Sequence, residues 1–170
     1  MKHIYFLRHA KSEWEEPYDT DEERSLSHRG KQQSKALRDY LKDSRFEFDI
    51  CLVSPSERTK RTYHTLRKDI LRLPKPEYRE SLYDAEKEDI LFLLHGLPTG
   101  VRSCCVVGHN PGLEELASEL LFGETNHSRF HKFPTAAFLG LSFPSENWKD
   151  LSSGTCKLVV YWIPGMIGKE

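Results

Sequence analysis

Short apolar runs alternate with stretches of helical periodicity along most of the chain. The runs have the length of strands, most are rich in Val, Ile, Leu, Phe or Cys, and they lie at residues 3–7, 49–53, 103–107, 136–143 and 156–163, and a further short strand is predicted near residues 77–79. Helical periodicity predicts helices at residues 27–42, after residue 54, at residues 86–95 and after residue 110. Strands that alternate with helices are typical of a parallel sheet covered on both faces. The sequence therefore predicts an α/β fold, a three-layer α/β/α sandwich with a mostly parallel central sheet, in which the last two strands form a hairpin or a meander.

Two of the predicted helices carry start signals directly after a predicted strand. In Ser54-Pro55-Ser56-Glu57, the pattern predicts a capping box with its N-cap at Ser54, the first helical residue at Pro55 and the N3 position at Glu57. In the later helix, Asn110 is the predicted N-cap and Pro111 the predicted first helical residue. Both helix N-termini are therefore expected at the sheet edge where the strands end.

Length and charge exclude several classes of protein. The chain of 170 residues has the size of one ordinary domain, and we expect residues 1–170 to form a single domain. Its 25 Lys and Arg residues face 26 Asp and Glu residues, and the resulting net charge of −1 disfavours nucleic acid as a partner. The sequence contains no stretch of roughly 20 apolar residues that would span a membrane, and its N-terminus lacks the apolar region of a signal peptide.

The cysteines point to a reducing compartment. They form no C-x-x-C pair, and they are Cys51, Cys104, Cys105 and Cys156. Cys104 and Cys105 are neighbours in a predicted strand, so their side chains are expected on opposite faces of the sheet. Because free buried thiols are typical of proteins in reducing surroundings, we expect a cytoplasmic protein without membrane attachment.

Arginine and histidine residues follow three of the predicted strands. Arg8 and His9 come after the first strand, Arg58 lies in the first turn of the next capped helix, and His109 precedes a helix N-terminus. The carboxyl ends of parallel strands meet at one edge of a sheet, where ligands bind. Helix N-termini add free N–H groups and a positive dipole at that edge, and arginine binds phosphate oxygens in a bidentate manner. The pattern therefore predicts a phosphate site that contains imidazole.

Imidazole in a phosphate site favours nucleophilic catalysis at phosphorus. A neutral histidine can attack in line and form a covalent phosphohistidine, which water then hydrolyses. The sequence has neither a Walker-type phosphate loop nor an acidic cluster with the spacing of metal ligands, so we expect no metal and no other cofactor. His127 and His131 have the i, i+4 spacing of a metal pair, but no third ligand is evident near them in the sequence.

Several segments in register resemble the motifs of one family. Arg8–Ser12 resembles the Arg-His-Gly signature of the histidine phosphatase superfamily, which includes the cofactor-dependent phosphoglycerate mutases. The compact form of the motif is most similar to the SixA-type phosphohistidine phosphatases. Further matching segments are residues 21–30 (Asp-x-x-Arg-x-Leu-[ST]-x-x-Gly), residues 54–62 (Ser-Pro-x-x-Arg-Thr-x-x-Thr), residues 106–111 (Val-Val-Gly-His-Asn-Pro) and residues 132–136 (Lys-Phe-Pro-Thr-Ala). The resemblance covers nearly the whole chain and implies a phosphoglycerate mutase-like fold.

The resemblance also implies roles for individual residues. His9 would be the nucleophile that accepts the phosphoryl group, Arg8 and Arg58 would hold the phosphate oxygens, and His109 would donate to the phosphoryl group. Ser12 would contribute to substrate binding. Arg24 either approaches the phosphate as well or ties down the loop after the first motif, and both alternatives stay open.

The sequence departs from the family pattern at two positions, and its general acid has two candidates. Ala10 replaces the glycine of the superfamily signature, and Glu15 stands where many longer members have asparagine. The general acid of the mutase branch comes from a segment between the motifs at residues 54–62 and 106–111, where Asp84 and Glu86 are both candidates. A phosphohistidine substrate needs less acid assistance than a phosphate ester, because its imidazole leaving group takes up a proton readily, so an acid could also be absent.

The sequence leaves three functions to compare. The first is a metal-independent phosphatase that removes phosphate from phosphohistidine on a partner protein, a substrate that suits a short chain with little room for a lid. The second is a small-molecule phosphomonoesterase of the same superfamily, acting on a small phosphoester. The third is a catalytically weak phosphate-binding or scaffold protein.

Overall fold

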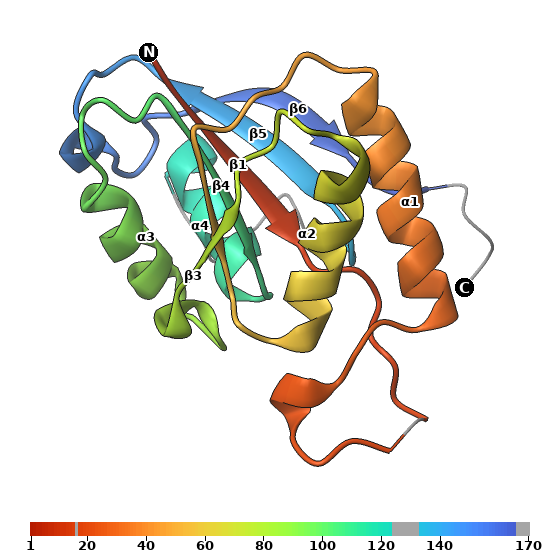
Figure 1. Ribbon diagram of the computed structural model, residues 1–170. Helices are drawn as coiled ribbons and strands as arrows, with labels where there is room; N and C mark the ends of the chain where they lie inside the picture. Colours follow the sequence, from red (N-terminus) through yellow and green to blue (C-terminus); the bar gives the residue numbers. More distant parts are fainter. Residues whose placement is uncertain (16, 124–132, 166–170) are drawn as a thin grey trace.

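The computed structural model describes residues 1–15, 17–123 and 133–165, and within them a six-stranded sheet lies between two layers of helices (Figure 1). The strands are β1 (Lys2–Arg8), β2 (Ile50–Val53), β3 (Pro76–Tyr78), β4 (Ser103–Gly108), β5 (Phe138–Phe143) and β6 (Lys157–Trp162). The α-helices are α1 (His28–Lys42), α2 (Glu57–Asp69), α3 (Lys87–His95) and α4 (Gly112–Phe122). Short 3-10 turns lie at η1 (Asp21–Glu23), η2 (Glu80–Leu82) and η3 (Trp148–Asp150).

The strand order confirms the predicted α/β sandwich with a mostly parallel centre. The order across the sheet is β3-β2-β4-β1-β5-β6. The first four of these strands pair in parallel, β5 is antiparallel to β1, and β6 is antiparallel to β5. The carboxyl ends of β1, β2 and β4 therefore meet at one edge of the sheet, as the sequence predicts.

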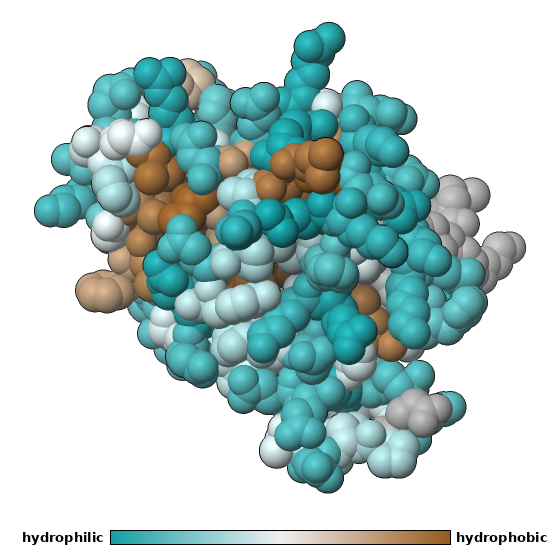
Figure 2. Space-filling model, viewed as in Figure 1, coloured by the Kyte–Doolittle hydropathy of each residue, from teal (hydrophilic) through white to brown (hydrophobic). Residues whose placement is uncertain are grey.

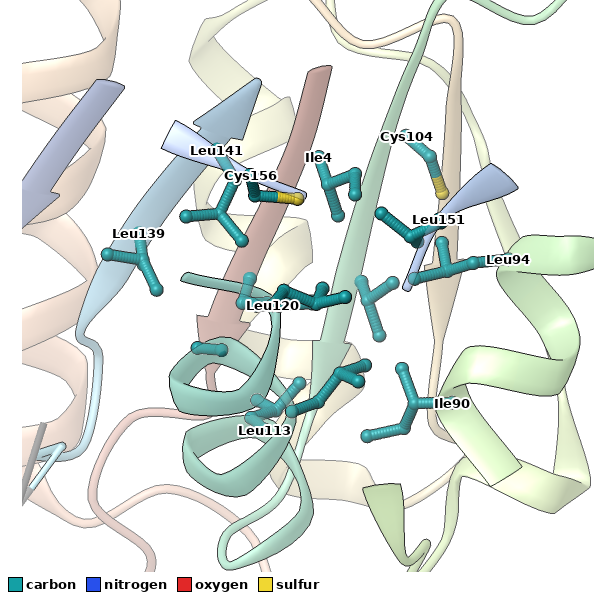
Figure 3. Close-up of a cluster of buried hydrophobic side chains, with 14 of the residues drawn as sticks. Ile4, Ile90, Leu94, Cys104, Leu113, Leu120, Leu139, Leu141, Leu151 and Cys156 are labelled. Atoms are coloured by element: carbon teal, nitrogen blue, oxygen red, sulfur yellow. The ribbon is translucent and has the colours of Figure 1, made fainter. Parts of the chain in front are cut away.

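Alternation along the strands divides the apolar side chains between two cores. Ile4 and Phe6 of β1 belong to the core under α3 and α4, whereas Tyr5 and Leu7 belong to the core under α1 and α2. Cys104 and Cys105 are divided in the same way, which confirms the expectation that they lie on opposite faces. Figure 3 shows the first core, in which side chains of the sheet meet those of α3 and α4. Helices thus bury both faces of the sheet, as a parallel sheet requires.

The predicted starts of two helices are wrong by one or two residues. The N-cap of α2 is Ser56, not Ser54, and the helix begins at Glu57. Ser54 stays extended because its N–H continues the pairing with β4, donating to the carbonyl of Val107 at 3.0 Å. The helix α4 begins at Gly112, with Pro111 at the N-cap position where Asn110 was predicted.

The start of β5 also differs from the prediction. The apolar run predicts a strand from residue 136, but β5 begins at Phe138. Ala136 has a φ of 64°, in the left-handed region, and its N–H donates to the carbonyls of Arg8 and His9 at 3.1 Å each. The chain therefore bends over the end of β1 before it enters the sheet.

The molecular surface is mainly hydrophilic on the face that Figure 2 shows, and apolar side chains gather on the side of α3. In the part of the chain that the structure describes, no helix has the length and apolar character needed to cross a membrane. His127, His131 and Lys132, which the sequence analysis named, lie outside the described residues.

Candidate active site

A cavity of about 780 Å³ opens at the edge of the sheet where β1, β2 and β4 end. Its lining includes Arg8, His9, Arg58 and His109, so the structure brings together the four residues that the sequence singled out. The rings of the two histidines lie with their centroids 5.3 Å apart. The remaining lining residues are Lys11, Ser12, Trp14, Arg24, Gln33, Asp84, Asn110, Pro134, Thr135, Ile163, Pro164 and Gly165.

His9 is held in a single tautomer by the backbone. Its Nδ1 lies 2.7 Å from the carbonyl oxygen of Ala10, and because a carbonyl only accepts, Nδ1 carries the hydrogen. The lone pair is therefore on Nε2. The loop is fixed in turn, because the His9 N–H donates to the carbonyl of Gly108 at 3.1 Å and the Ala10 N–H donates to Thr62 Oγ1 at 2.9 Å. His9 is thus an oriented imidazole with a free Nε2 lone pair.

Burial keeps the imidazole of His9 neutral. The side chain is almost fully buried, and this desolvation lowers the pKa of His9 to about 3. The hydrogen bond to Ala10 opposes the shift, whereas His109, Arg58 and Arg8 lower the pKa further. At neutral pH the ring is therefore unprotonated, which is the state in which a histidine is nucleophilic.

His109 is a second neutral imidazole in the same cavity. Burial, followed by the charge of Arg58, lowers the pKa of His109 to about 4. Its Nε2 forms a hydrogen bond with Ser54 Oγ at 2.8 Å. The ring of Tyr83 meets it edge-on at 5.7 Å between centroids. The sequence predicts that Ser54 caps a helix, but its side chain instead orients His109.

Two guanidinium groups complete the polar wall of the cavity. Arg8 Nη1 donates to the carbonyl of Phe133 at 2.9 Å, and Arg58 donates to the carbonyl and the carboxylate of Asp21 at 2.9 and 3.0 Å. In both arginines Nε is buried and has no hydrogen-bond partner among the described residues. An unsatisfied buried N–H costs about 1–3 kcal/mol. Both arginines also line the cavity, and guanidinium groups bind phosphate oxygens in a bidentate manner, so the arrangement favours phosphate.

Arg24 ties down the loop after the first motif, one of the two alternatives, and it also lies at the cavity where a phosphate would bind. It lines the cavity, and it ties down the loop by donating to Ser12 Oγ and, at 2.9 Å, to Asp21 Oδ1. Its guanidinium carbon lies 3.5 Å from the centroid of the Trp14 ring, which stacks against it. Arg24 therefore belongs to the cavity wall and to the loop that forms it.

The two candidate acids occupy different places. Asp84 lines the cavity and has a φ of 52°, in the left-handed region. Glu86 does not line the cavity: its carboxylate accepts the N–H of Asp89 in the capping box that starts α3. The structure thus brings Asp84 to the site and leaves Glu86 at a helix terminus.

Asp21 and Tyr83 are site residues that the sequence analysis missed. Asp21 belongs to the segment at residues 21–30 quoted for the family resemblance, but no periodicity or spacing places its carboxylate beside Arg58. Tyr83 lies in the segment searched for an acid, and its hydroxyl donates to Asp21. Both residues act through partners distant in the chain, which local patterns do not report.

The described part of the cavity offers anion ligands rather than metal ligands. Across residues 1–15, 17–123 and 133–165, no group of three or more His, Cys, Asp or Glu side chains is placed to hold a metal ion. The lining instead combines arginines with two neutral imidazoles. Such a site can hold a tetrahedral oxyanion and present a nitrogen nucleophile to it.

Comparisons with known proteins agree with this chemistry. The sequence profile of the histidine phosphatase superfamily (branch 1) matches residues 4–86. An uncharacterized protein of Mycobacterium leprae is 24% identical over 165 residues, which cover 93% of this chain and 99% of that protein. A candidate phosphohistidine phosphatase SixA of Agrobacterium tumefaciens is 26% identical, with a TM-score of 0.81 over 96% of this chain and 98% of its own. The protein histidine phosphatase SixA, in a structure complexed with tungstate, is 25% identical, with a TM-score of 0.77 over 95% and 97% of the two chains.

These findings bear out the family resemblance inferred from the motifs. The matched region contains the segments at residues 8–12, 21–30 and 54–62, and the structural similarity extends over almost the whole of both chains. The phosphoglycerate mutase-like fold that the resemblance implies is therefore confirmed. The chain is similar to the histidine phosphatase superfamily over residues 4–86 and to SixA-type phosphatases over nearly its whole length, and we conclude that it is a phosphatase.

Proposed function

We propose that this phosphatase acts through a covalent phosphohistidine on His9 and removes phosphate from phosphohistidine on a partner protein. The observation that carries the proposal is the hydrogen bond from His9 Nδ1 to the carbonyl of Ala10, at 2.7 Å, inside a cavity lined by arginines. It leaves Nε2 unprotonated where an oxyanion would bind.

In the first step, His9 Nε2 attacks phosphorus in line. A bond forms between Nε2 and phosphorus as the bond between phosphorus and the leaving-group nitrogen breaks, and the released imidazole takes up a proton. Arg8 and Arg58 hold the equatorial oxygens and balance their charge in the transition state. If Ser54 donates its hydroxyl hydrogen to His109 Nε2, the ring hydrogen of His109 is on Nδ1 and serves as a further donor to the phosphoryl group.

In the second step, water attacks the phosphorus of the phosphorylated His9. The bond to Nε2 breaks, inorganic phosphate is released, and the neutral imidazole is restored. Asp84 is the candidate acid or base of this site, because its side chain lines the cavity. An imidazole leaving group needs less protonation than an alkoxide, so we expect Asp84 to contribute more to the hydrolysis of phosphate esters than to that of phosphohistidine.

A protein substrate is supported by the relatives of similar size. The SixA structures match this chain over 95% or more of both chains, and one of them is described as a protein histidine phosphatase. A chain of this size has little room for the lid insertions that would enclose a small substrate. An open site suits a phosphorylated side chain on the surface of another protein.

The second candidate is a small-molecule phosphomonoesterase with the same catalytic residues. The cavity of about 780 Å³ is much larger than a phosphate group, and Trp14, Ile163 and Pro164 line it as well. It therefore has room for a small organic leaving group. This candidate shares the mechanism at His9 and differs only in the leaving group.

The test is to trap the intermediate and to compare substrates. Brief incubation with a small protein labelled with phosphate on histidine is expected to give an adduct on His9 that is labile in acid and stable in base. His9→Ala abolishes the adduct, and His64→Ala, which changes an exposed histidine of α2, keeps it. An adduct on any other residue contradicts the mechanism. Turnover of sugar or nucleotide phosphates that is orders of magnitude faster than that of phosphohistidine protein favours the second candidate, and inactivity on every substrate favours a phosphate-binding protein.

A further inference from the structure

One carboxylate connects three side chains of the active site. Asp21 Oδ1 accepts from Arg24 at 2.9 Å, and Asp21 Oδ2 accepts from Arg58 at 3.0 Å and from the hydroxyl of Tyr83. The Asp21 carbonyl oxygen accepts a second hydrogen bond from Arg58 at 2.9 Å. Arg24, Arg58 and Tyr83 come from three separate segments, and in Figure 1 the loop that carries Asp21 lies beyond the carboxyl end of β1.

The contacts of Asp21 determine which edge of Arg58 remains for a ligand. Two of the three guanidinium nitrogens of Arg58 are engaged by Asp21, and the side chain is about 95% buried. Asp21 does not engage the second hydrogen on each terminal nitrogen or the Nε hydrogen, which is buried and has no partner among the described residues. A guanidinium group clamped on one side in this way cannot rotate freely, so its remaining donors keep a fixed direction.

The carboxylate is charged throughout the range in which an enzyme works. The hydrogen bond from Tyr83, followed by those from Arg24 and Arg58, holds the pKa of Asp21 well below its usual range. Both carboxylate oxygens of Asp21 accept hydrogen bonds from guanidinium groups, Oδ1 from Arg24 and Oδ2 from Arg58. Guanidinium nitrogens can only donate. An asparagine at this position would therefore direct its amide group at either Arg24 or Arg58, donor against donor.

We propose that Asp21 is a positioning residue, which fixes the guanidinium group of Arg58 in the orientation needed for phosphoryl transfer. The inference rests on the proposed function and adds a residue to it. Asp21 is not among the residues that line the cavity, so it acts through Arg58 and not on the substrate. An oriented donor matters most in the transition state, where the charge and geometry of the phosphoryl oxygens are most demanding. Attraction between phosphate and the positive charge of Arg58, in contrast, does not require a fixed orientation.

Kinetics of Asp21→Asn separate these two effects. With an aryl phosphate as substrate, we expect kcat to fall at least tenfold, while the inhibition constant of inorganic phosphate changes less than threefold. The matched control is Glu22→Gln, which removes the same charge from the same 3-10 turn at an exposed position and is expected to keep both constants. Wild-type kcat in Asp21→Asn, or a loss confined to phosphate affinity, overturns the proposal.

A double-mutant cycle tests whether Asp21 acts through Arg58. In an Arg58→Ala background, Asp21→Asn is expected to change kcat less than twofold, because the group it positions is gone. An equal tenfold loss in both backgrounds overturns the proposal and assigns Asp21 an independent role. Tyr83→Phe removes one donor to Asp21 but keeps the ring beside His109, so it is expected to cost less than Asp21→Asn. Failure of the proposed function is seen separately, as a wild-type enzyme that forms no adduct on His9.

Discussion

The two neutral histidines of the cavity predict a specific dependence of stability on pH. Burial lowers the pKa of His9 to about 3 and that of His109 to about 4, whereas histidine in an unfolded chain has a pKa of roughly 6.5. Between these values the unfolded chain binds more protons than the folded protein. The free energy of unfolding therefore decreases as the pH falls from about 6.5 towards the folded values.

The magnitude follows from the proton bound on unfolding. At pH 5 an unfolded histidine is almost fully protonated, because the pH lies about 1.5 units below its pKa. Each histidine that stays neutral in the folded protein therefore lowers the free energy of unfolding by about 2 kcal/mol at this pH. The result depends little on the folded values, since both lie below 5. His9 and His109 together thus lower the free energy of unfolding by about 4 kcal/mol between pH 8 and pH 5. Asp21, whose pKa is also lowered, adds stability that is lost only below about pH 4.

Urea denaturation at pH 8, 7, 6 and 5 measures this dependence. Buffers without phosphate are required, because an oxyanion that binds the folded state would stabilise it. Other groups titrate as well, so the decisive quantity is the difference between the wild type and His9→Asn or His109→Asn. Each variant is expected to lose about 2 kcal/mol less than the wild type between pH 8 and pH 5. Variants whose stability falls as steeply as that of the wild type would refute the reasoning, because the histidines would then be protonated in the folded protein.

Three other perturbations test separate parts of the structure. Ser54→Ala removes the hydrogen bond to His109 Nε2, and kcat on an aryl phosphate is expected to fall about tenfold, the equivalent of about 1.4 kcal/mol, while Ser56→Ala changes it less than twofold. An unchanged kcat in Ser54→Ala would show that His109 keeps its place without Ser54. Gly30→Ala places a Cβ 2.0 Å from the carbonyl oxygen of Lys11, so we expect it to lower the free energy of unfolding by more than about 2 kcal/mol in urea titrations. In the control Gly100→Ala the Cβ lies in open space, and the free energy of unfolding is expected to change by less than about 0.5 kcal/mol. Tungstate or phosphate at about 100 times its Kd for the wild type is expected to stabilise the wild type by about 2.7 kcal/mol in thermal unfolding. Equal stabilisation of Arg58→Ala at the same ligand concentration would exclude Arg58 from the anion site.

The sheet could be predicted from the sequence because burial leaves a local signature. The strands β1, β2 and β4 are apolar on both faces, and their side chains alternate between the two cores. The start of α2 could not be predicted in the same way. Ser54 and Ser56 both offer a capping side chain, and the choice is made by a backbone hydrogen bond from Ser54 to Val107 in a neighbouring strand. A local pattern contains no information about that partner.

The same distinction explains which site residues the sequence revealed. Arg8 ends β1, and His9 and His109 directly follow β1 and β4, so the topology of a parallel sheet alone brings these residues to one edge. Asp21 and Tyr83 lie in segments without periodicity, and the contacts that place them join residues 37 and 62 positions apart. Their positions depend on how the loop folds against the cavity, which no spacing along the chain encodes.

The arginines of the cavity affect the protonation of the two histidines as well as the charge that a ligand would meet. Burial is the main cause of the lowered pKa of His9, but Arg58 and Arg8 lower it further, and Arg58 does the same to His109. The positive charge that attracts phosphate therefore also keeps protons off the two imidazoles. The position of Arg58 therefore has a second consequence, because a guanidinium group farther from the two imidazoles would lower the pKa values of His9 and His109 less. Asp21 holds Arg58 against the cavity at the cost of placing a negative charge nearby, and its carboxylate is turned to the donors of Arg24, Arg58 and Tyr83 rather than into the phosphate site.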